Sequence, residues 1–161
     1  MSQQNPGQMI QVPNTLKLKV GGRFGALDAN AIAKAEAALK SLSGNFSQWL
    51  QDEVVKLDGA RQRVRAEGMT AETMEFLYLR AHDLKGLGAT YEFPLITRIA
   101  ASLCRLIDDK DKRTEAPIAL IDAHIDTIKA AVRDEIKTDD HPVGRILIQE
   151  LERKVAATGA V

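Results

Sequence analysis

The side chains best suited to chemistry in this sequence are His82 and Lys85, which stand directly before Gly86. Residues three and four positions apart share one face of a helix, so these residues would point the same way. A neutral imidazole nitrogen is a competent nucleophile toward an acyl phosphate. An imidazole with the ordinary pKa of about 6.5 is largely neutral at cellular pH. The spacing therefore indicates a nucleophile with a cation and bare backbone beside it.

These residues lie in a helical pattern that runs from about Thr70 to Tyr91. The face opposite His82 reads as a buried seam, formed by Leu77, Ala81, Leu84, Gly88 and Tyr91. Glycine inside a helix costs about 1 kcal/mol relative to alanine, so Gly86 and Gly88 each need a reason. Gly86 shares the face of His82, where another molecule's backbone could come close. Gly88 faces the seam, where it would allow close packing of two helices.

The run His82-Asp83-Leu84-Lys85-Gly86, followed by an amphipathic helix from Leu95 to Leu106, resembles the histidine-containing phosphotransfer (HPt) domain of the stand-alone bacterial type. That family's pattern is a histidine, a lysine three later and a glycine four later, on the second helix of a four-helix bundle. The resemblance covers about Phe46 to Lys137. The run also resembles the H-box of histidine kinases, but that box normally continues into a proline where this chain has Leu87. This difference favours the HPt interpretation.

The resemblance implies a phosphorelay intermediate without kinase activity of its own. His82 would accept a phosphoryl group from a receiver-domain phosphoaspartate and pass it reversibly to another response regulator. Lys85 would help neutralise the phosphoryl oxygens, and Gly86 would let the receiver's active-site loop approach. The implied partners are response-regulator receiver domains and a hybrid histidine kinase. This chain would bind no cofactor, because Mg²⁺ would belong to the receiver, whose carboxylates suit a hard cation.

Several neighbours of His82 have more than one interpretation. Tyr78, Leu79 and Ala89 flank it and could form an apolar rim for docking a partner, or could be partly buried against neighbouring helices. Asp83 follows His82 directly. Because adjacent helical residues point about 100° apart, we expect Asp83 to be a solvated charge or half of a salt bridge.

His124 and Cys104 are expected to be structural. His124 lies beside a seam of isoleucines, and His141 precedes Pro142 in a turn where it should be exposed. Cys104 is the only cysteine, so no intrachain disulfide can form, and it is expected to be a small buried thiol. A zinc site built from His82, Cys104 and His124 is not expected, because no pair of these ligands has a recognised spacing.

Composition limits the possible function classes. The chain has 161 residues, which suits one domain, and its 22 basic residues balance its 22 acidic residues. A balanced charge argues against nucleic-acid binding, whose usual signature is a basic excess. The sequence has no apolar run of eighteen residues and no recognisable signal peptide. We therefore expect a cytoplasmic protein that partners other proteins and neither crosses membranes nor binds nucleic acid. A monomer is expected, because one chain supplies enough helices for a bundle.

The periodicity predicts an all-α fold, an antiparallel up-down-up-down four-helix bundle with extra N- and C-terminal helices. Residues 1–26 are expected to form an extended or partly disordered arm. Residues 27–158 would form the HPt-like helical domain, with the core bundle at 46–137.

Local signals predict where the helices begin and end. Asp28 would cap a first helix that breaks at 43–45, and Gly68 would close the second. Pro94 would open the helix after the histidine helix. Thr114 would cap the next one, and Val143, Ile146, Leu147, Leu151 and Val155 would form the apolar stripe of the last.

Two alternative functions remain open at the level of sequence. The chain could be a dimeric phosphotransferase related to the dimerisation half of a histidine kinase. It could also be a non-enzymatic helical adaptor that binds and regulates a kinase. Dimerisation through a shared bundle would favour the first alternative, and binding that survives loss of the His82 imidazole would favour the second.

Overall fold

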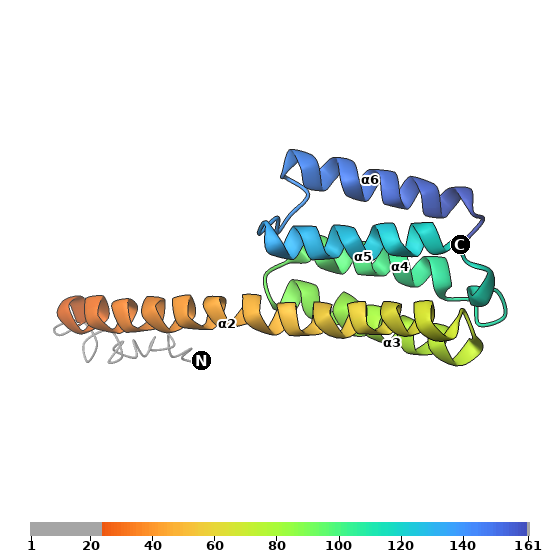
Figure 1. Cartoon of the computed structure of the whole chain (residues 1–161). Coiled ribbons are helices and arrows are strands. Elements are labelled where there is room, and N and C mark those ends of the chain that lie inside the picture. Colours follow the sequence, from red (N-terminus) through yellow and green to blue (C-terminus); the bar gives the residue numbers. More distant parts are fainter. Residues whose placement is uncertain (1–23, 161) are drawn as a thin grey trace, which may run out of the picture. The chain divides into compact units, whose positions relative to one another are not determined.

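A computed structural model describes residues 24–160, and all regular structure in this range is helical. The predicted all-α class is therefore confirmed. The elements are α2 (Phe24–Glu67), α3 (Ala71–Thr90), α4 (Pro94–Ile107), the short 3₁₀ helix η1 (Arg113–Glu115), α5 (Ile118–Arg133) and α6 (Pro142–Ala157), as Figure 1 shows.

The chain divides into two units, one ending at Lys40 and the other beginning at Ser41. The described part of the first unit is the N-terminal portion of α2, on which Ile32 and Leu39 are exposed. Most of the predicted N-terminal arm lies outside the described residues. Its last residues, 24–26, belong to α2, so the predicted end of the arm is wrong.

The predicted helix break at 43–45 is also wrong, because α2 continues through these residues without interruption. A Cβ on Gly44 would have no neighbour within 4 Å, so the glycine serves no packing need. One interior glycine costs about 1 kcal/mol, which a propagating helix with one hydrogen bond per residue can absorb. The predicted extra N-terminal helix and the helix predicted to follow it are therefore one helix, α2.

The signals at the next two helix boundaries are confirmed. Gly68 has φ +89°, the left-handed conformation that ends a helix at glycine, and its N–H donates to the Val64 carbonyl at 2.8 Å. Thr70 then caps α3, exchanging hydrogen bonds with Thr73 in a capping box. Pro94 occupies the first turn of α4, where its missing N–H costs nothing.

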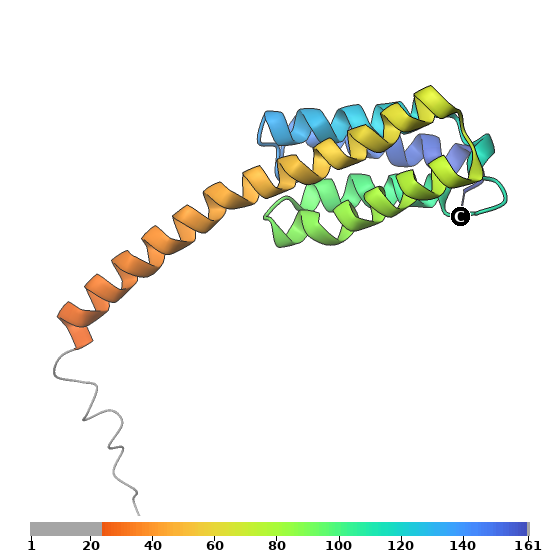
Figure 2. The ribbon, with the colours of Figure 1, turned by 60° about the horizontal axis from the view of Figure 1, so that its bottom comes forward.

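α4 is the central helix of the second unit and contacts α3, α5 and α6 (Figure 1; Figure 2). Apolar side chains of α2 to α5, and one just after the end of α5, form the buried core. They include Leu50, Val54, Leu57, Ala60, Val64, Leu77, Ala81, Leu84, Leu95, Ile96, Ile99, Leu103, Leu106, Ile107, Ile121, Ile125, Ile128, Val132 and Ile136. The core therefore fills the space among these helices, and it leaves the polar faces to solvent.

Two predictions for the second half of the chain need correction. Thr114 lies in η1 and does not cap a helix; α5 begins at Ile118 with Pro117 at its N-cap. In α6 the buried positions are Gly144, Ile148, Leu151 and Val155, whereas the predicted stripe members Val143, Ile146 and Leu147 are exposed. The reason is a close approach at Gly144, where a Cβ would lie 3.0 Å from side-chain carbons of Leu95 and Ile136.

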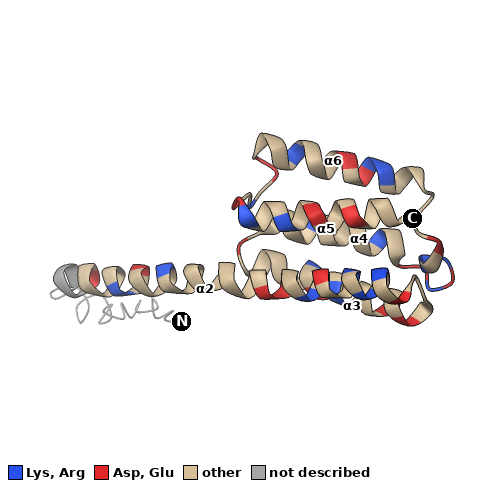
Figure 3. Ribbon diagram, in the orientation of Figure 1, with Lys and Arg blue, Asp and Glu red and all other residues tan. Residues whose placement is uncertain are grey.

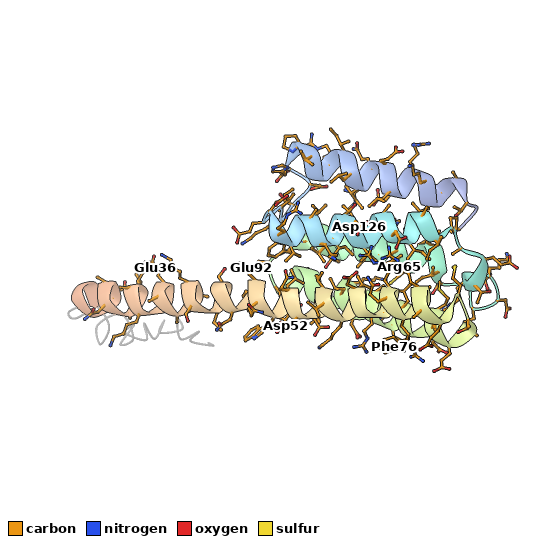
Figure 4. All side chains as sticks on the ribbon, in the orientation of Figure 1. Glu36, Asp52, Arg65, Phe76, Glu92 and Asp126 are labelled. Atoms are coloured by element: carbon orange, nitrogen blue, oxygen red, sulfur yellow. The ribbon has the colours of Figure 1, made fainter. Side chains whose placement is uncertain are left out.

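Charged residues of both signs are interspersed along the helices (Figure 3). The strongest cluster joins α2 to α5, where the buried Arg61 donates to Asp126 at 2.7 Å and also pairs with Asp58. Figure 4 labels Arg65 of α2 and Asp126 of α5 in the same zone. Among residues 24–160, no helix combines the length and the apolarity that crossing a bilayer requires.

Candidate functional site

His82 lies in the middle of α3 with its side chain exposed to solvent. The opposite face of the helix carries Met74, Leu77, Ala81 and Leu84, all buried in the core. This amphipathic division fixes the rotation of α3 about its axis and so directs His82 outward. Among the described residues, the imidazole has no hydrogen-bond or ion-pair partner in the protein, so both ring nitrogens are open to another molecule.

The next turn of α3 keeps the approach to His82 open. Lys85 is exposed and has no ion-pair partner among residues 24–160. Gly86 is exposed as well, and a Cβ built there would meet no atom within 4 Å. His82 therefore has a free ammonium group one turn away and a stretch of helix without a side chain next to it.

Gly88 has a different environment from Gly86. A Cβ at this position would lie 2.6 Å from both the backbone nitrogen and the hydroxyl oxygen of Thr97, and 3.1 Å from the Phe93 carbonyl oxygen. The Thr97 hydroxyl also accepts a hydrogen bond from the Ala89 N–H at 2.7 Å. Only glycine allows α3 and the start of α4 to approach this closely.

Asp83 is engaged away from His82. Its carboxylate pairs with Arg80 at 3.2 Å, one turn back along α3. The Arg80 guanidinium in turn lies over the ring of Phe76, 5.4 Å from its centroid. This agrees with the expected salt bridge and gives Asp83 a partner other than the imidazole.

A shallow, open hollow runs beside His82, between α3 and α2. It is lined by Glu53 and Lys56 of α2 and by Arg80, His82, Asp83, Gly86 and Leu87 of α3. Lys56 and Glu53 form an ion pair of 2.6 Å within α2. The walls of the hollow thus carry balanced charge, and a group attached to His82 or a partner loop over Gly86 would lie against them.

The predicted rim residues have unequal environments. Tyr78 is half-buried against the core, and its hydroxyl donates to Asp108 at 2.9 Å, which raises the pKa of the phenol. Leu79 is 47% exposed and Ala89 is exposed. Leu79 and Ala89 are accessible for docking, whereas Tyr78 is held by the protein itself.

His124 and Cys104 lie in the core. His124 is fully buried; its Nδ1–H donates to the Leu120 carbonyl at 2.7 Å, so its Nε2 accepts from the Ser102 hydroxyl at 3.0 Å. Burial lowers the pKa of His124 and raises that of the Cys104 thiol to about 11. Among the described residues, no group of three or more histidine, cysteine or acidic side chains could hold a metal ion.

Sequence reasoning missed the contribution of α2 to this surface. Lys56 and Glu53 belong to its polar face, and nothing in their own helix marks them. Lys56 and Arg80 lie the same number of residues before and after Gly68. If two antiparallel helices are joined at Gly68, these two residues lie opposite each other, so the sequence could have indicated that Lys56 is near the histidine helix face. Beyond the hollow, Phe46 and Trp49 form an aromatic cluster with Tyr91, with ring centroids 5.6–5.8 Å apart. Tyr91 is too far along the chain from Phe46 and Trp49 for helical periodicity to predict this cluster.

Comparison of the chain with protein-family models, with curated proteins and with solved structures finds no match.

Proposed function

We propose that this protein is a phosphorelay intermediate that carries a phosphoryl group on His82. The single observation that carries the proposal is the exposure of this imidazole at mid-helix, with Lys85 and the open Gly86 one turn further on. The proposal includes the resemblance to an HPt domain and an up-down-up-down arrangement of α2, α3, α4 and α5, to which α6 is an addition. It also implies a cytoplasmic protein that acts as a monomer.

The proposed reaction is an in-line displacement at phosphorus. The lone pair of neutral Nε2 attacks the phosphoryl group of an aspartyl phosphate on a partner receiver domain. A P–N bond forms, the acyl P–O bond breaks, and the aspartate leaves as a carboxylate. The proton on Nδ1 stays on the ring during transfer, so no base has to remove it first.

Residues around His82 supply positioning and charge in this scheme, which is what phosphoryl transfer chiefly needs. Lys85 balances negative charge on the transferred group, and Gly86 leaves room for the partner's loop. Mg²⁺ belongs to the receiver in this proposal. The reaction is reversible, because a phosphohistidine can donate to the carboxylate of a second regulator.

The test is phosphoryl uptake from a panel of radiolabelled phospho-receiver domains and from phosphoramidate as a small donor. We expect label that is labile in acid and stable in base. His82→Gln should abolish uptake, whereas His141→Gln, which alters another exposed histidine, should leave it unchanged. Uptake that persists in His82→Gln would disprove the assignment of the nucleophile.

The adaptor function remains a second candidate because of the aromatic cluster of Phe46, Trp49 and Tyr91. Trp49 is 41% exposed and lines a second hollow with Lys56 and Glu53, next to the one beside His82. Partly exposed aromatic rings are typical anchors of protein interfaces. Receiver binding by His82→Ala that is as tight as that of wild type, together with no transfer by wild type, would favour this candidate.

A further inference from the structure

The ring of Tyr78 connects His82 to residues well beyond α3. The ring centroids of Tyr78 and His82 lie 6.1 Å apart with an interplanar angle of 40°, within the range of favourable aromatic pairs. The two residues are four positions apart on the helix. Helical side chains lean toward the N-terminus, so the imidazole leans toward the preceding turn, where Tyr78 lies.

Tyr78 is itself fixed by groups outside its helix. Its hydroxyl donates to the Asp108 carboxylate at 2.9 Å, just after the end of α4. The guanidinium of Arg113 in η1 lies over the ring, 4.6 Å from the centroid. Arg113 is 3% exposed and donates to the Asp108 carbonyl at 3.0 Å, so the two groups that hold Tyr78 also hold each other.

His82 therefore has a rigid neighbour on one side and no side chain on the other. Tyr78 limits rotation of the imidazole toward the N-terminal turn. Gly86, four residues later, offers nothing for the ring to rest against. Among the described residues no hydrogen bond fixes the imidazole, so the Tyr78 ring, with its centroid 6.1 Å away, is the neighbour placed to restrict the His82 side-chain torsions.

We infer that Tyr78, held by Asp108 and Arg113, is a positioning residue that orients the His82 ring so that its open side faces the approach over Gly86. The effect of this orientation on reaction rate rests on the proposed function. The orientation of the His82 ring itself can be measured without phosphoryl transfer. Preorienting the nucleophile raises the rate of an in-line reaction, because the side chain then gives up less rotational freedom in reaching the transition state.

The test compares Tyr78→Leu, which removes the ring, and Tyr78→Phe, which removes only the bond to Asp108, with Phe76→Leu as the control. Phe76 is a partly exposed ring on a different face of the same helix, and it lies beneath two arginines, Arg63 and Arg80. Side-chain three-bond couplings of His82, measured by NMR on the full chain, report its χ1 populations. We expect a single dominant rotamer in wild type and in Phe76→Leu, rotamer averaging in Tyr78→Leu, and partial averaging in Tyr78→Phe.

A second pair of variants tests whether Asp108, which does not touch His82, affects the His82 ring through Tyr78. Asp108→Ala should loosen the His82 rotamer as Tyr78→Phe does, whereas Asp109→Ala, at the neighbouring residue, should not. Uptake from phosphoramidate should slow about three- to tenfold in Tyr78→Leu. With a phospho-receiver, kcat should fall while KM changes little, because the defect is in orientation.

The inference is overturned if Tyr78→Leu leaves the His82 couplings unchanged, or if Phe76→Leu changes them equally. A rise in KM with unchanged kcat would also overturn it, since that result makes Tyr78 a docking residue. If wild type takes up no phosphoryl group from any donor while the couplings respond as expected, the proposed function fails and the orienting contact stands.

Discussion

At the scale of single residues, the two histidines of α3 and α5 show how burial separates one side-chain type into two roles. His82 is exposed and has no partner in the described part of the protein, whereas His124 is fully buried with both ring nitrogens bonded. A buried imidazole that already donates from one nitrogen and accepts at the other gains nothing from a second proton. His124 therefore serves the core, and its titration should be visible in the stability of the fold.

Stability should fall as the pH is lowered below about 6.5, the ordinary histidine pKa. Burial lowers the pKa of His124 in the folded state, so the unfolded chain binds the proton more readily and acid favours unfolding. Urea unfolding from pH 7.5 to 5 should show a slope of up to about 1.4 kcal/mol per pH unit. The slope should weaken in His124→Gln and persist in His141→Gln; an equal slope in all three proteins would contradict the assignment.

The two glycines of α3 should respond oppositely to alanine. Gly86→Ala adds a Cβ in open space and improves helix propensity, so it should stabilise the protein by up to about 1 kcal/mol. Gly88→Ala drives a Cβ against the backbone of Thr97 and should destabilise it by about 1–3 kcal/mol. Thermal unfolding measures both.

Phosphoryl uptake tests whether the bare backbone at Gly86 is needed for docking a partner. If a partner's backbone passes over this position, Gly86→Ala should slow uptake from a phospho-receiver more than uptake from phosphoramidate. Equal rates with wild type for both donors would show that the bare backbone is not needed for docking.

At the scale of elements, α2 is longer than its local signals suggest. The Ser43-Gly44-Asn45 run has weak helix formers, yet the helix continues through it, and Ser43 donates a hydrogen bond to Glu92 beyond the end of α3 at 2.9 Å. Capping residues and a glycine indicate a boundary only when the chain must turn there. Here nothing in the second unit requires a turn before Gly68.

Gly44→Ala should therefore increase helicity and stability, by up to about 1 kcal/mol, because the new methyl group meets no neighbour. Far-UV circular dichroism and thermal unfolding provide the measurement. Gly59→Ala, at another open position inside α2, is the matched control and should give a gain of similar size. A gain at Gly59 with none at Gly44 would mean that 43–45 is not helical in solution.

At the scale of the whole molecule, the ionic cluster around Arg61 joins segments distant in sequence. Arg61 is 4% exposed and contacts the carboxylates of Asp58 and Asp126. Lys129 of α5 reaches Asp58 at 2.9 Å. Burial alone would raise the pKa of Asp58, but hydrogen bonds from Lys129 and Arg61 outweigh it and lower the pKa.

Removing the Arg61 guanidinium should lower the stability of the fold, because the carboxylates around it then lack their buried cationic partner. Arg61→Met should destabilise the protein by about 3 kcal/mol in urea unfolding at neutral pH. Arg153→Met, which removes an exposed arginine paired with Glu150 inside α6, should barely change stability.

Acid should reveal the same cluster. Because the pKa of Asp58 is lowered in the folded state, its contribution is present above the ordinary value near 4 and is lost as the pH falls through the folded value. Arg61→Met should therefore lose less stability than wild type on acidification below about pH 4. An equal loss of stability in both proteins would show that the ion pairs of Arg61 do not cause the acid sensitivity.

The sequence by itself determined that the chain is helical and which face of α3 is buried, because both follow from local physics. The 3.6-residue period placed Leu77, Ala81 and Leu84 in the core and so turned His82 outward. The left-handed conformation at Gly68 and the cap at Thr70 needed only neighbouring residues.

Tertiary structure decided what depends on residues far apart in the chain. The contact at Gly144 selected which face of α6 is buried. The fold alone brought Asp108 and Arg113 onto Tyr78. A pattern within one helix sets which way a side chain points, but the group it meets belongs to another helix, and its position follows from how the helices pack.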